Sequence, residues 1–204
     1  MRRLVVVALL VAALGAVIGA ARLAMPLFGA SGAPSWYAEA VYPLDHAGAI
    51  RSSARRNGLD PALVAAVIYA ESRFDAQARS SQGAVGLMQI LPETADQIAR
   101  ETGGVAFITE DLEDPVVNVR YGCYYLRGAL DAFDGDAVAS VASYNAGMGA
   151  VAGWRADAAT EGHELRIGDI PYPETRAYVK TVLRARRVYR EVYGDRLGIP
   201  ADSG

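Results

Sequence analysis

The chain has 204 residues, a single cysteine and a formal net charge of −3. Three of its 20 basic residues and none of its 23 acidic residues lie before residue 31, so the rest of the chain has a net charge of −6. The lone Cys123 excludes an intramolecular disulfide, and the acidic balance argues against a nucleic-acid partner, because phosphate binding depends on clustered Lys and Arg.

The first 30 residues contain a long apolar segment. An uncharged run over residues 4–21 follows two arginines and ends at a third. As a helix this run spans about 27 Å, close to the thickness of the hydrocarbon core of a bilayer. Secretory apolar regions are usually only about 7–15 residues long, which favours a retained signal anchor, while small residues at 19–21 and 31–33 leave a cleaved signal peptide open. The leading arginines predict that the remainder is exported.

The apolar segment is followed by an expected linker over residues 31–42, rich in Gly, Ser, Ala and Pro, and by one domain over residues 43–204. We expect this domain to lie outside the cytoplasm, anchored to the cytoplasmic membrane through the N-terminal helix, and to be a monomer. Gly15 and Gly19 have the spacing of a helix-pairing motif, but small residues are common throughout the segment and explain it without dimerisation.

The exported part has a helical pattern, with apolar residues recurring at helical spacing instead of strict alternation. Asp-Pro pairs at 60–61 and 114–115 place a capping residue before a proline, which is typical of a helix start. The expected helices cover residues 45–57, 60–72, 92–102, 114–130, 136–146 and 173–193, the last stopped by Gly194. The sequence therefore predicts a mainly α fold, with Cys123 as a buried small hydrophobe and the arginines at 184–190 on a solvated face.

Glu71 is the candidate acid of this domain. It follows Val67 and Ile68 by three or four residues and so lies on or beside their apolar face. Burial disfavours the charged form of a carboxyl and raises its pKa, which a proton-donating acid needs in order to stay protonated near neutral pH. Taken alone, Glu71 is more typical of a residue that pairs with Arg73 or another arginine at a helix end, and the segment that follows it changes this balance.

The segment over residues 80–92 is unlike a plain loop, because it holds two glycines three residues apart and then an amide. Glycine permits close approach of the backbone to a ligand, and the Gln89 amide offers a donor and an acceptor to sugar hydroxyls and acetamido groups. Leu87, Met88 and Ile90 are also candidates for the core. No metal site is expected, since His46 and His163 lack partners at metal-binding spacing.

Four motifs together resemble those of the soluble-type lytic transglycosylases, and they occur in that family's order over residues 45–193. They are Glu71-Ser72, Gly83-x-x-Gly86-Leu87-Met88-Gln89, Tyr144-Asn145-Ala146-Gly147 and Ile170-Pro171-Tyr172-x-Glu174-Thr175-Arg176-x-Tyr178-Val179, with a fitting helix around residues 118–122. The resemblance implies a lysozyme-like helical domain that cleaves peptidoglycan.

The resemblance makes Glu71 the catalytic acid/base and also implies a set of substrate-binding residues. These are Ser80, Gly86, Met88, Gln89, Tyr144, Asn145, Tyr172 and Glu174, with Ser81 an alternative to Ser80. Structural roles compete for three of them: a core aromatic for Tyr144, a helix C-cap for Asn145, and a favourable charge in the first helical turn for Glu174.

The implied reaction cleaves the MurNAc-β-1,4-GlcNAc bond without water and leaves a 1,6-anhydro-MurNAc end, with Glu71 as the single acid/base and no cofactor. The implied partners are peptidoglycan glycan strands and, through the N-terminal helix, the membrane. Two alternatives stay open. One is a hydrolytic lysozyme with Asp75 or Glu174 as its second carboxylate, and the other is a non-catalytic wall-binding or scaffolding envelope protein.

Overall fold

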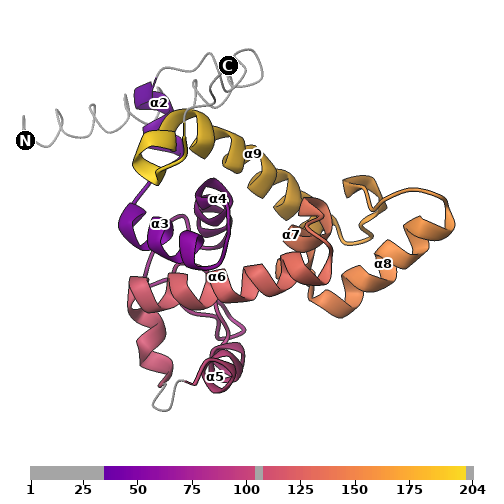
Figure 1. The fold of residues 1–204 in the computed structure, drawn as a ribbon, viewed down its shortest axis with the longest axis horizontal. Helices are drawn as coiled ribbons and strands as arrows, with labels where there is room; N and C mark the ends of the chain where they lie inside the picture. The colour runs from indigo at the N-terminus through magenta and orange to yellow at the C-terminus, as the bar shows by residue number, and fades with distance from the viewer. Residues whose placement is uncertain (1–34, 104–107, 201–204) are drawn as a thin grey trace, which may run out of the picture. The chain divides into compact units, whose positions relative to one another are not determined.

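The computed structural model of the protein describes residues 35–103 and 108–200 (Figure 1). The chain divides into two compact units, residues 1–41 and residues 42–204. Within the described part of the chain, no helix has the length and apolar character that crossing a membrane requires.

The first unit contributes one described element, helix α2, Ser35–Val41. This helix occupies the second half of the expected linker 31–42, so part of that segment is helical. The expected N-terminal apolar helix, within residues 1–30, lies outside the described residues.

The second unit is built from helices, as the sequence predicts. They are α3 (Ala47–Arg56), α4 (Pro61–Glu71), α5 (Pro92–Glu101), α6 (Pro115–Ala132), α7 (Ala137–Ala146), α8 (Met148–Thr160) and α9 (Pro173–Leu197), with 3-10 helices η2 (Thr109–Glu113) and η3 (Ile167–Asp169). Among the described residues the only β-type pairing consists of isolated bridges from Val85 to Arg79 and to Ile90. The mainly α fold is confirmed.

Three helices begin at aspartates that cap them. Asp60, Asp114 and Asp136 each accept hydrogen bonds from backbone N–H groups in the first helical turn, at 2.8–3.1 Å. Proline occupies the first position of α4 and of α6, where its missing N–H removes no hydrogen bond. The expected starts of these helices are therefore confirmed, together with their physical cause.

Two features of the C-terminal part differ from expectation. Helix α9 continues through Gly194 and ends at Leu197, where Gly198 caps it with a left-handed φ of 67°. A glycine inside a helix costs about 1 kcal/mol relative to alanine, and burial of Tyr193 and Leu197 outweighs that cost. Helix α8 was not predicted, because it buries only two residues and so has little apolar periodicity.

Helix α4 lies at the centre of the second unit (Figure 1). Its residues from Ala62 to Tyr69 are all buried, so it is apolar on every face, as a helix inside a core is. It packs most extensively against α9, and α3 contacts both α4 and α6. Because α4 ends at Glu71, the buried helix places the carboxyl group of Glu71 at the edge of the core. On α6, Cys123 is fully buried as expected, and burial raises the pKa of its thiol to about 12.

Candidate active site

Glu71 is the last residue of α4 and is partly buried. Burial raises the pKa of its carboxyl to about 7, while a hydrogen bond from the Tyr178 hydroxyl to Oε1, 2.6 Å long, acts in the opposite direction. Among the described residues, no ion pair joins Glu71 to Arg73, whose guanidinium instead lies 3.9 Å from the centre of the Tyr69 ring. The carboxyl is thus a weak acid that keeps its proton up to near-neutral pH.

The chain leaves α4 through a tight turn next to Glu71. Arg73 and Phe74 have left-handed φ values of 56° and 68°, which cost free energy for residues with a Cβ. Two features stabilise this turn. The Phe74 side chain is buried, and the Ser72 hydroxyl donates a hydrogen bond to the carbonyl of Leu87 at 2.9 Å. The glycine-containing segment is therefore fastened directly beside the residue that follows Glu71.

Helix α9 holds both ends of α4. At the first end, Arg186 Nε and Arg190 Nη2 lie 2.7 and 3.1 Å from the same Oδ2 atom of Asp60. Burial raises the pKa of Asp60, but these arginines and the N–H of Ala62 outweigh burial and lower the pKa overall. At the other end, Tyr178 bonds Glu71. The arginines of residues 184–190 lie on a largely solvated face, as predicted, and two of them, Arg186 and Arg190, also bind the N-cap residue of α4.

Gly86 has an internal packing role. Its φ is 78°, and a Cβ added there would lie 2.3 Å from Nδ2 of Asn118. Asn118 is buried; it donates to the carbonyls of Val85 and Leu112 at 2.8 and 2.9 Å and accepts from the N–H of Met88 at 2.8 Å. Glycine is therefore required at this position by packing, because the Asn118 amide fills the space that a side chain would need, and substrate binding by Gly86 stays a prediction.

Met88 is also a core residue. Its side chain is completely buried, and a Cβ added to Gly122 of α6 would lie only 2.3 Å from its sulfur. The alternative that Met88 lies in the core is confirmed, and its assignment to substrate binding stays a prediction. Its backbone carbonyl accepts a 3.0 Å hydrogen bond from the Tyr144 hydroxyl, which ties the segment to α7.

Ser80 and Gln89 stabilise the same segment through polar contacts. Ser80 is exposed, and its hydroxyl oxygen accepts from the N–H groups of Gln82 and Ala84 at 3.3 and 3.0 Å. Gln89 has a φ of 48° and donates from Nε2 to the carbonyls of Ala78 and Gly86, both at 3.0 Å. The hydroxyl proton of Ser80 and Oε1 of Gln89 are the parts of these groups that remain for a ligand.

The end of α7 and the start of α9 meet beside the same carboxyl. The pKa values of the Tyr144 and Tyr178 hydroxyls are raised, mainly by burial. The nearby charge of Glu71 raises both pKa values further. Asn145 is exposed, and its Oδ1 accepts a 2.7 Å hydrogen bond from the hydroxyl of Thr175, which is almost fully buried. Thr175 thereby orients the amide with Nδ2 turned away from the hydrogen bond.

Tyr172 and Glu174 lie on the surface at the start of α9. The Tyr172 ring is 54% exposed and contacts the Trp154 ring of α8 in an edge-to-face arrangement, with 5.1 Å between ring centres. Glu174 is exposed in the first turn of α9, where a negative charge is favourable. Both are accessible to a large ligand.

Sequence reasoning did not single out Tyr178, Thr175 or Asn118 as site residues. Tyr178 and Thr175 fall within the quoted motif at residues 170–179, and Tyr178 follows Glu174 by one helical turn. That spacing places Tyr178 on the same face of the helix as Glu174 and could have indicated it as a site residue. The partner of Asn118 lies 30 residues away along the chain, which no local pattern reveals.

Comparisons with known proteins agree with this geometry. The family model described as the Transglycosylase SLT domain matches residues 48–167. The soluble lytic murein transglycosylase of Escherichia coli (strain K12) is 35% identical over 133 residues, which are 64% of this chain and 21% of that protein. The chain thus spans about a fifth of the length of this curated relative.

Two solved structures share the fold. Lytic transglycosylase Slt from Pseudomonas aeruginosa, solved as an inactive mutant, superposes with a TM-score of 0.68 and 32% identity, over 89% of this chain and 30% of that chain. The 70 kDa soluble lytic transglycosylase from Escherichia coli superposes with a TM-score of 0.72 and 28% identity, over 82% of this chain and 27% of that chain.

Proposed function

Because the chain belongs to the Transglycosylase SLT domain family, we propose that it is a peptidoglycan lytic transglycosylase with Glu71 as its single acid/base. The substrate would be the MurNAc-β-1,4-GlcNAc bond of wall glycan. The observation that carries this proposal is the partly buried carboxyl at the end of α4, whose pKa desolvation raises to about 7, beside the motif-bearing segments of α7 and α9.

The first step breaks the glycosidic bond. Protonated Glu71 donates its proton to the oxygen between the two sugars as the bond from that oxygen to C1 of MurNAc breaks. A carboxyl with a pKa near the working pH supports this role, because it is both largely protonated and able to release the proton. Tyr178 occupies Oε1, which leaves Oε2 for the transferred proton.

The second step closes a ring within the sugar. The acetamido group of MurNAc stabilises the positive charge at C1 until the 6-hydroxyl oxygen of the same sugar attacks that carbon. Deprotonated Glu71 accepts the proton of this hydroxyl. One carbon–oxygen bond replaces another, the carboxyl regains its proton, and no water is consumed.

A single acting carboxylate is supported by the surroundings of Glu71. Most glycosidases use two carboxyl groups, about 5–5.5 Å apart for retention or 6.5–9.5 Å apart for inversion. Among the described residues, no second carboxylate contributes to the raised pKa of Glu71. Asp75 is exposed and accepts a hydrogen bond from the N–H of Gln77 at 2.9 Å, and Glu174 is exposed, so neither resembles a second buried acid.

We further propose that the glycan contacts the polar and aromatic groups around Glu71. Support comes from the exposed Asn145 amide that Thr175 orients, and from the exposed Tyr172 ring. The remaining proposed contacts are Ser80, Gly86, Met88, Gln89, Tyr144 and Glu174.

A cellular location in the envelope, outside the cytoplasm, follows from this substrate. We propose that the apolar segment of residues 4–21 is retained as a membrane anchor, with the leading arginines on the cytoplasmic side. The length of the segment supports retention over cleavage.

Mass spectrometry of the soluble muropeptides released from purified peptidoglycan tests the proposed reaction. Wild-type protein is expected to release 1,6-anhydro products, which are lighter by one water than hydrolysis products. Glu71→Gln is expected to lose at least about 100-fold in release rate, because it removes general acid/base catalysis. Glu191→Gln, an exposed change on α9, is the matched control and is expected to keep wild-type activity.

Three outcomes would contradict the proposal. Products that carry the added water would instead show a hydrolytic lysozyme, and undiminished release by Glu71→Gln would remove Glu71 from the reaction. No release by folded wild-type protein would favour a non-catalytic wall-binding role.

A further inference from the structure

Trp154 of α8 and Tyr172 at the start of α9 form an aromatic pair at the protein surface. Their ring centres are 5.1 Å apart and their planes lie at 85°, so the edge of one ring points at the face of the other. The Tyr172 side chain is 54% exposed, and Trp154 is partly exposed. A ligand can therefore cover the open side of the aromatic pair without separating the two rings.

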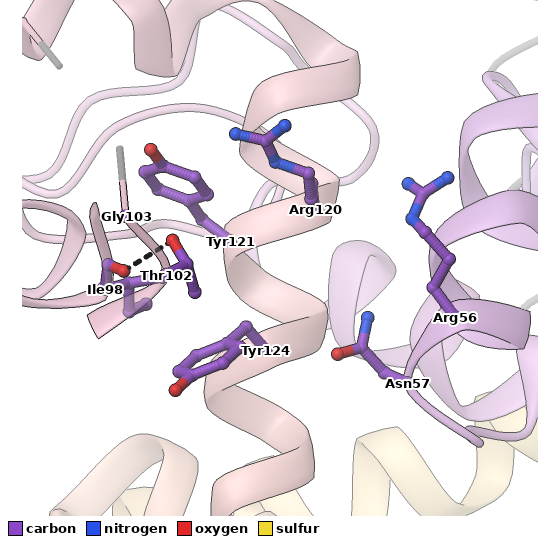
Figure 2. Close-up of a pocket in the computed structure, with 8 residues that line it drawn as sticks. All are labelled: Arg56, Asn57, Ile98, Thr102, Gly103, Arg120, Tyr121 and Tyr124. Atoms are coloured by element: carbon purple, nitrogen blue, oxygen red, sulfur yellow. Dashed lines mark hydrogen bonds between the residues drawn. The ribbon is translucent and has the colours of Figure 1, made fainter. Parts of the chain in front are cut away.

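One other aromatic side chain, Tyr124, is among the exposed large apolar residues of the described chain. It lies on α6 beside a cavity of about 440 Å³ (Figure 2), and its hydroxyl donates to Glu101 at 3.1 Å. Its ring pairs with no other ring among the residues that the structure describes. An exposed ring with a second ring beside it is thus found at Tyr172 and not at Tyr124.

The path of the chain brings Trp154 back to the candidate active site. Helix α8 and the 3-10 helix η3 connect the end of α7 to the start of α9. The two ends of this connection meet where the Thr175 hydroxyl donates to Asn145 Oδ1 at 2.7 Å. Trp154 lies three or four residues from Val151 and Ala158, the two buried residues of α8, and so shares their face of the helix. The indole therefore lies on the inner side of α8.

The aromatic pair lies close to the proposed acid along α9. Tyr172 precedes Tyr178 by six residues, which is about 9 Å along the helix axis. Tyr178 donates its hydrogen bond to Glu71. A glycan strand that is cleaved beside Glu71 continues on both sides of the broken bond, so it can reach the pair without contacting it at the reacting sugar itself.

Free polar groups surround the two rings. Among the described residues, neither the indole N–H of Trp154 nor the hydroxyl of Tyr172 has a hydrogen-bond partner. The exposed Glu174 carboxylate follows two residues after Tyr172. A pyranose ring has hydroxyl groups around its edge and C–H groups on its face, so it is bound by an apolar surface with donors and acceptors beside it. The aromatic pair has this combination.

The size of the aromatic pair favours a sugar over a protein partner. An aromatic side chain buries only about 150–250 Å² even when it is fully covered, whereas each partner in a standard protein interface contributes about 800 Å². Among the described residues of α8, none is an exposed large apolar residue that would extend the surface of the pair. The exposed positions near Trp154 are small or polar, such as Ala152, Ala156 and Asp157.

We propose that Trp154 and Tyr172 form a stacking subsite for one sugar of the wall glycan, away from the bond that is cleaved. The identity of the glycan rests on the proposed function, whereas the sugar chemistry rests on the two rings and the polar groups beside them. The consequence is a preference for chain length, because strands that reach the subsite are bound and cleaved better than fragments that do not.

Tryptophan fluorescence tests the subsite directly, because the chain has two tryptophans. In the full-length variant Trp36→Phe/Glu71→Gln, the emission comes from Trp154 alone, and loss of the acid prevents cleavage during the titration. Chitohexaose, a β-1,4-linked hexamer of GlcNAc, is expected to change this emission saturably. Adding Tyr172→Ala is expected to weaken binding about tenfold. Ala156→Gln, an exposed change two residues from Trp154 and on the opposite side of α8, is the matched control and is expected to leave binding unchanged.

The kinetic test compares long glycan strands with the shortest fragment that wild-type protein cleaves. Trp154→Ala is expected to lower kcat/KM about tenfold on the strands and to leave the short fragment unaffected, and Trp154→Phe, which keeps a ring, is expected to lose less. An equal loss on both substrates would show a merely structural role for Trp154 and overturn the subsite. No loss on either substrate would overturn it as well.

The binding test separates this inference from the proposed function, because it needs no cleavage. Emission from Trp154 that does not respond to chitohexaose, or an affinity that Tyr172→Ala does not change, overturns the subsite even if wall glycan is cleaved. Saturable binding that Tyr172→Ala weakens supports the subsite even if wild-type protein releases no muropeptides.

Discussion

Two opposing effects control the proton on Glu71. Burial makes the charged carboxylate unfavourable and raises its pKa, whereas the Tyr178 hydroxyl donates a hydrogen bond that favours the charged form. The balance leaves the pKa at about 7, so both forms are accessible near neutral pH. An acid that must give up a proton and take one back within a single turnover requires this balance.

Tyr178→Phe is expected to move the alkaline limb of the pH–rate profile upward. Activity requires protonated Glu71, so the rate falls as pH rises through the carboxyl pKa of about 7. Removing a hydrogen bond to the charged form raises that pKa, and the limb moves to higher pH by about one pH unit. The measurement is kcat/KM for muropeptide release between pH 5 and 9.

Tyr125→Phe is the matched control for this change, because Tyr125 contacts the ring of Tyr144 and its hydroxyl has no hydrogen bond to Glu71. Its limb is expected to stay in place. A Tyr178→Phe limb that moves to lower pH would contradict the assigned direction of the hydrogen bond's effect.

Part of the residue-level picture is predictable from the sequence. Glu71 follows buried Val67 and Ile68 by one turn of the helix, so its burial follows from periodicity. The packing of Gly86 and Met88 against α6 was not predictable, because local patterns cannot distinguish a glycine that admits a ligand from one that admits a neighbouring side chain. The contacts that decide their roles come from Asn118 and Gly122 on α6, about 30 residues further along the chain.

At the scale of elements, the pairing of α4 with α9 positions the site. Asp60 caps the start of α4 and binds Arg186 and Arg190 of α9, and the same helix reaches the far end of α4 through Tyr178. The two helices are thus joined at both ends as well as along their packed faces. Glu71 keeps its place because the helix that carries it is fixed at its start and at its end.

Asp60→Ala is expected to destabilise the domain by about 1–3 kcal/mol. The change removes an N-cap, which contributes about 1 kcal/mol, and two partly exposed ion pairs, which contribute less than about 1 kcal/mol each. Urea unfolding at pH 7 measures the change, since the lowered pKa of Asp60 keeps it charged there.

Asp131→Ala provides the comparison for that experiment. It removes an exposed ion pair with Arg127 on the surface of α6 and is expected to change stability by less than about 0.5 kcal/mol. Equal effects of the two substitutions would show that the contacts of Asp60 do not hold α4.

The predictability of elements follows from the strength of their local signals. Capping aspartates and first-turn prolines mark the starts of α4 and α6, and those starts agree with the structure. Helix α8 lacks a buried face, so the periodicity that reveals other helices is absent. The end of α9 was misplaced because tertiary burial of Tyr193 and Leu197 overrides the local preference of Gly194.

At the scale of the whole molecule, composition and motif order were enough to predict a mainly helical domain of the lytic transglycosylase kind. The solved relatives share this fold over most of the chain. The arrangement of the helices does not follow from composition, since it depends on long-range contacts such as those between α4 and α9.

The proposed anchor predicts that mature protein keeps residues 1–30. Protein made in cells is expected in the membrane fraction, to resist extraction by high salt and to be released by detergent, because an apolar segment of this length is stable in a bilayer. Intact mass spectrometry of the detergent extract measures the N-terminus. A mass that begins after residue 21 or residue 33 would show a cleaved signal peptide in place of an anchor.

The most direct test of the central claim is the titration of the Glu71 carboxyl itself. In carbon-13 NMR of protein labelled at glutamate carboxyl groups, the resonance missing from Glu71→Gln identifies this residue. The expected titration has its midpoint at about pH 7. A midpoint near 4.5, the value of an exposed glutamate, would show a solvated carboxylate and contradict the proposed role of Glu71 as the acid.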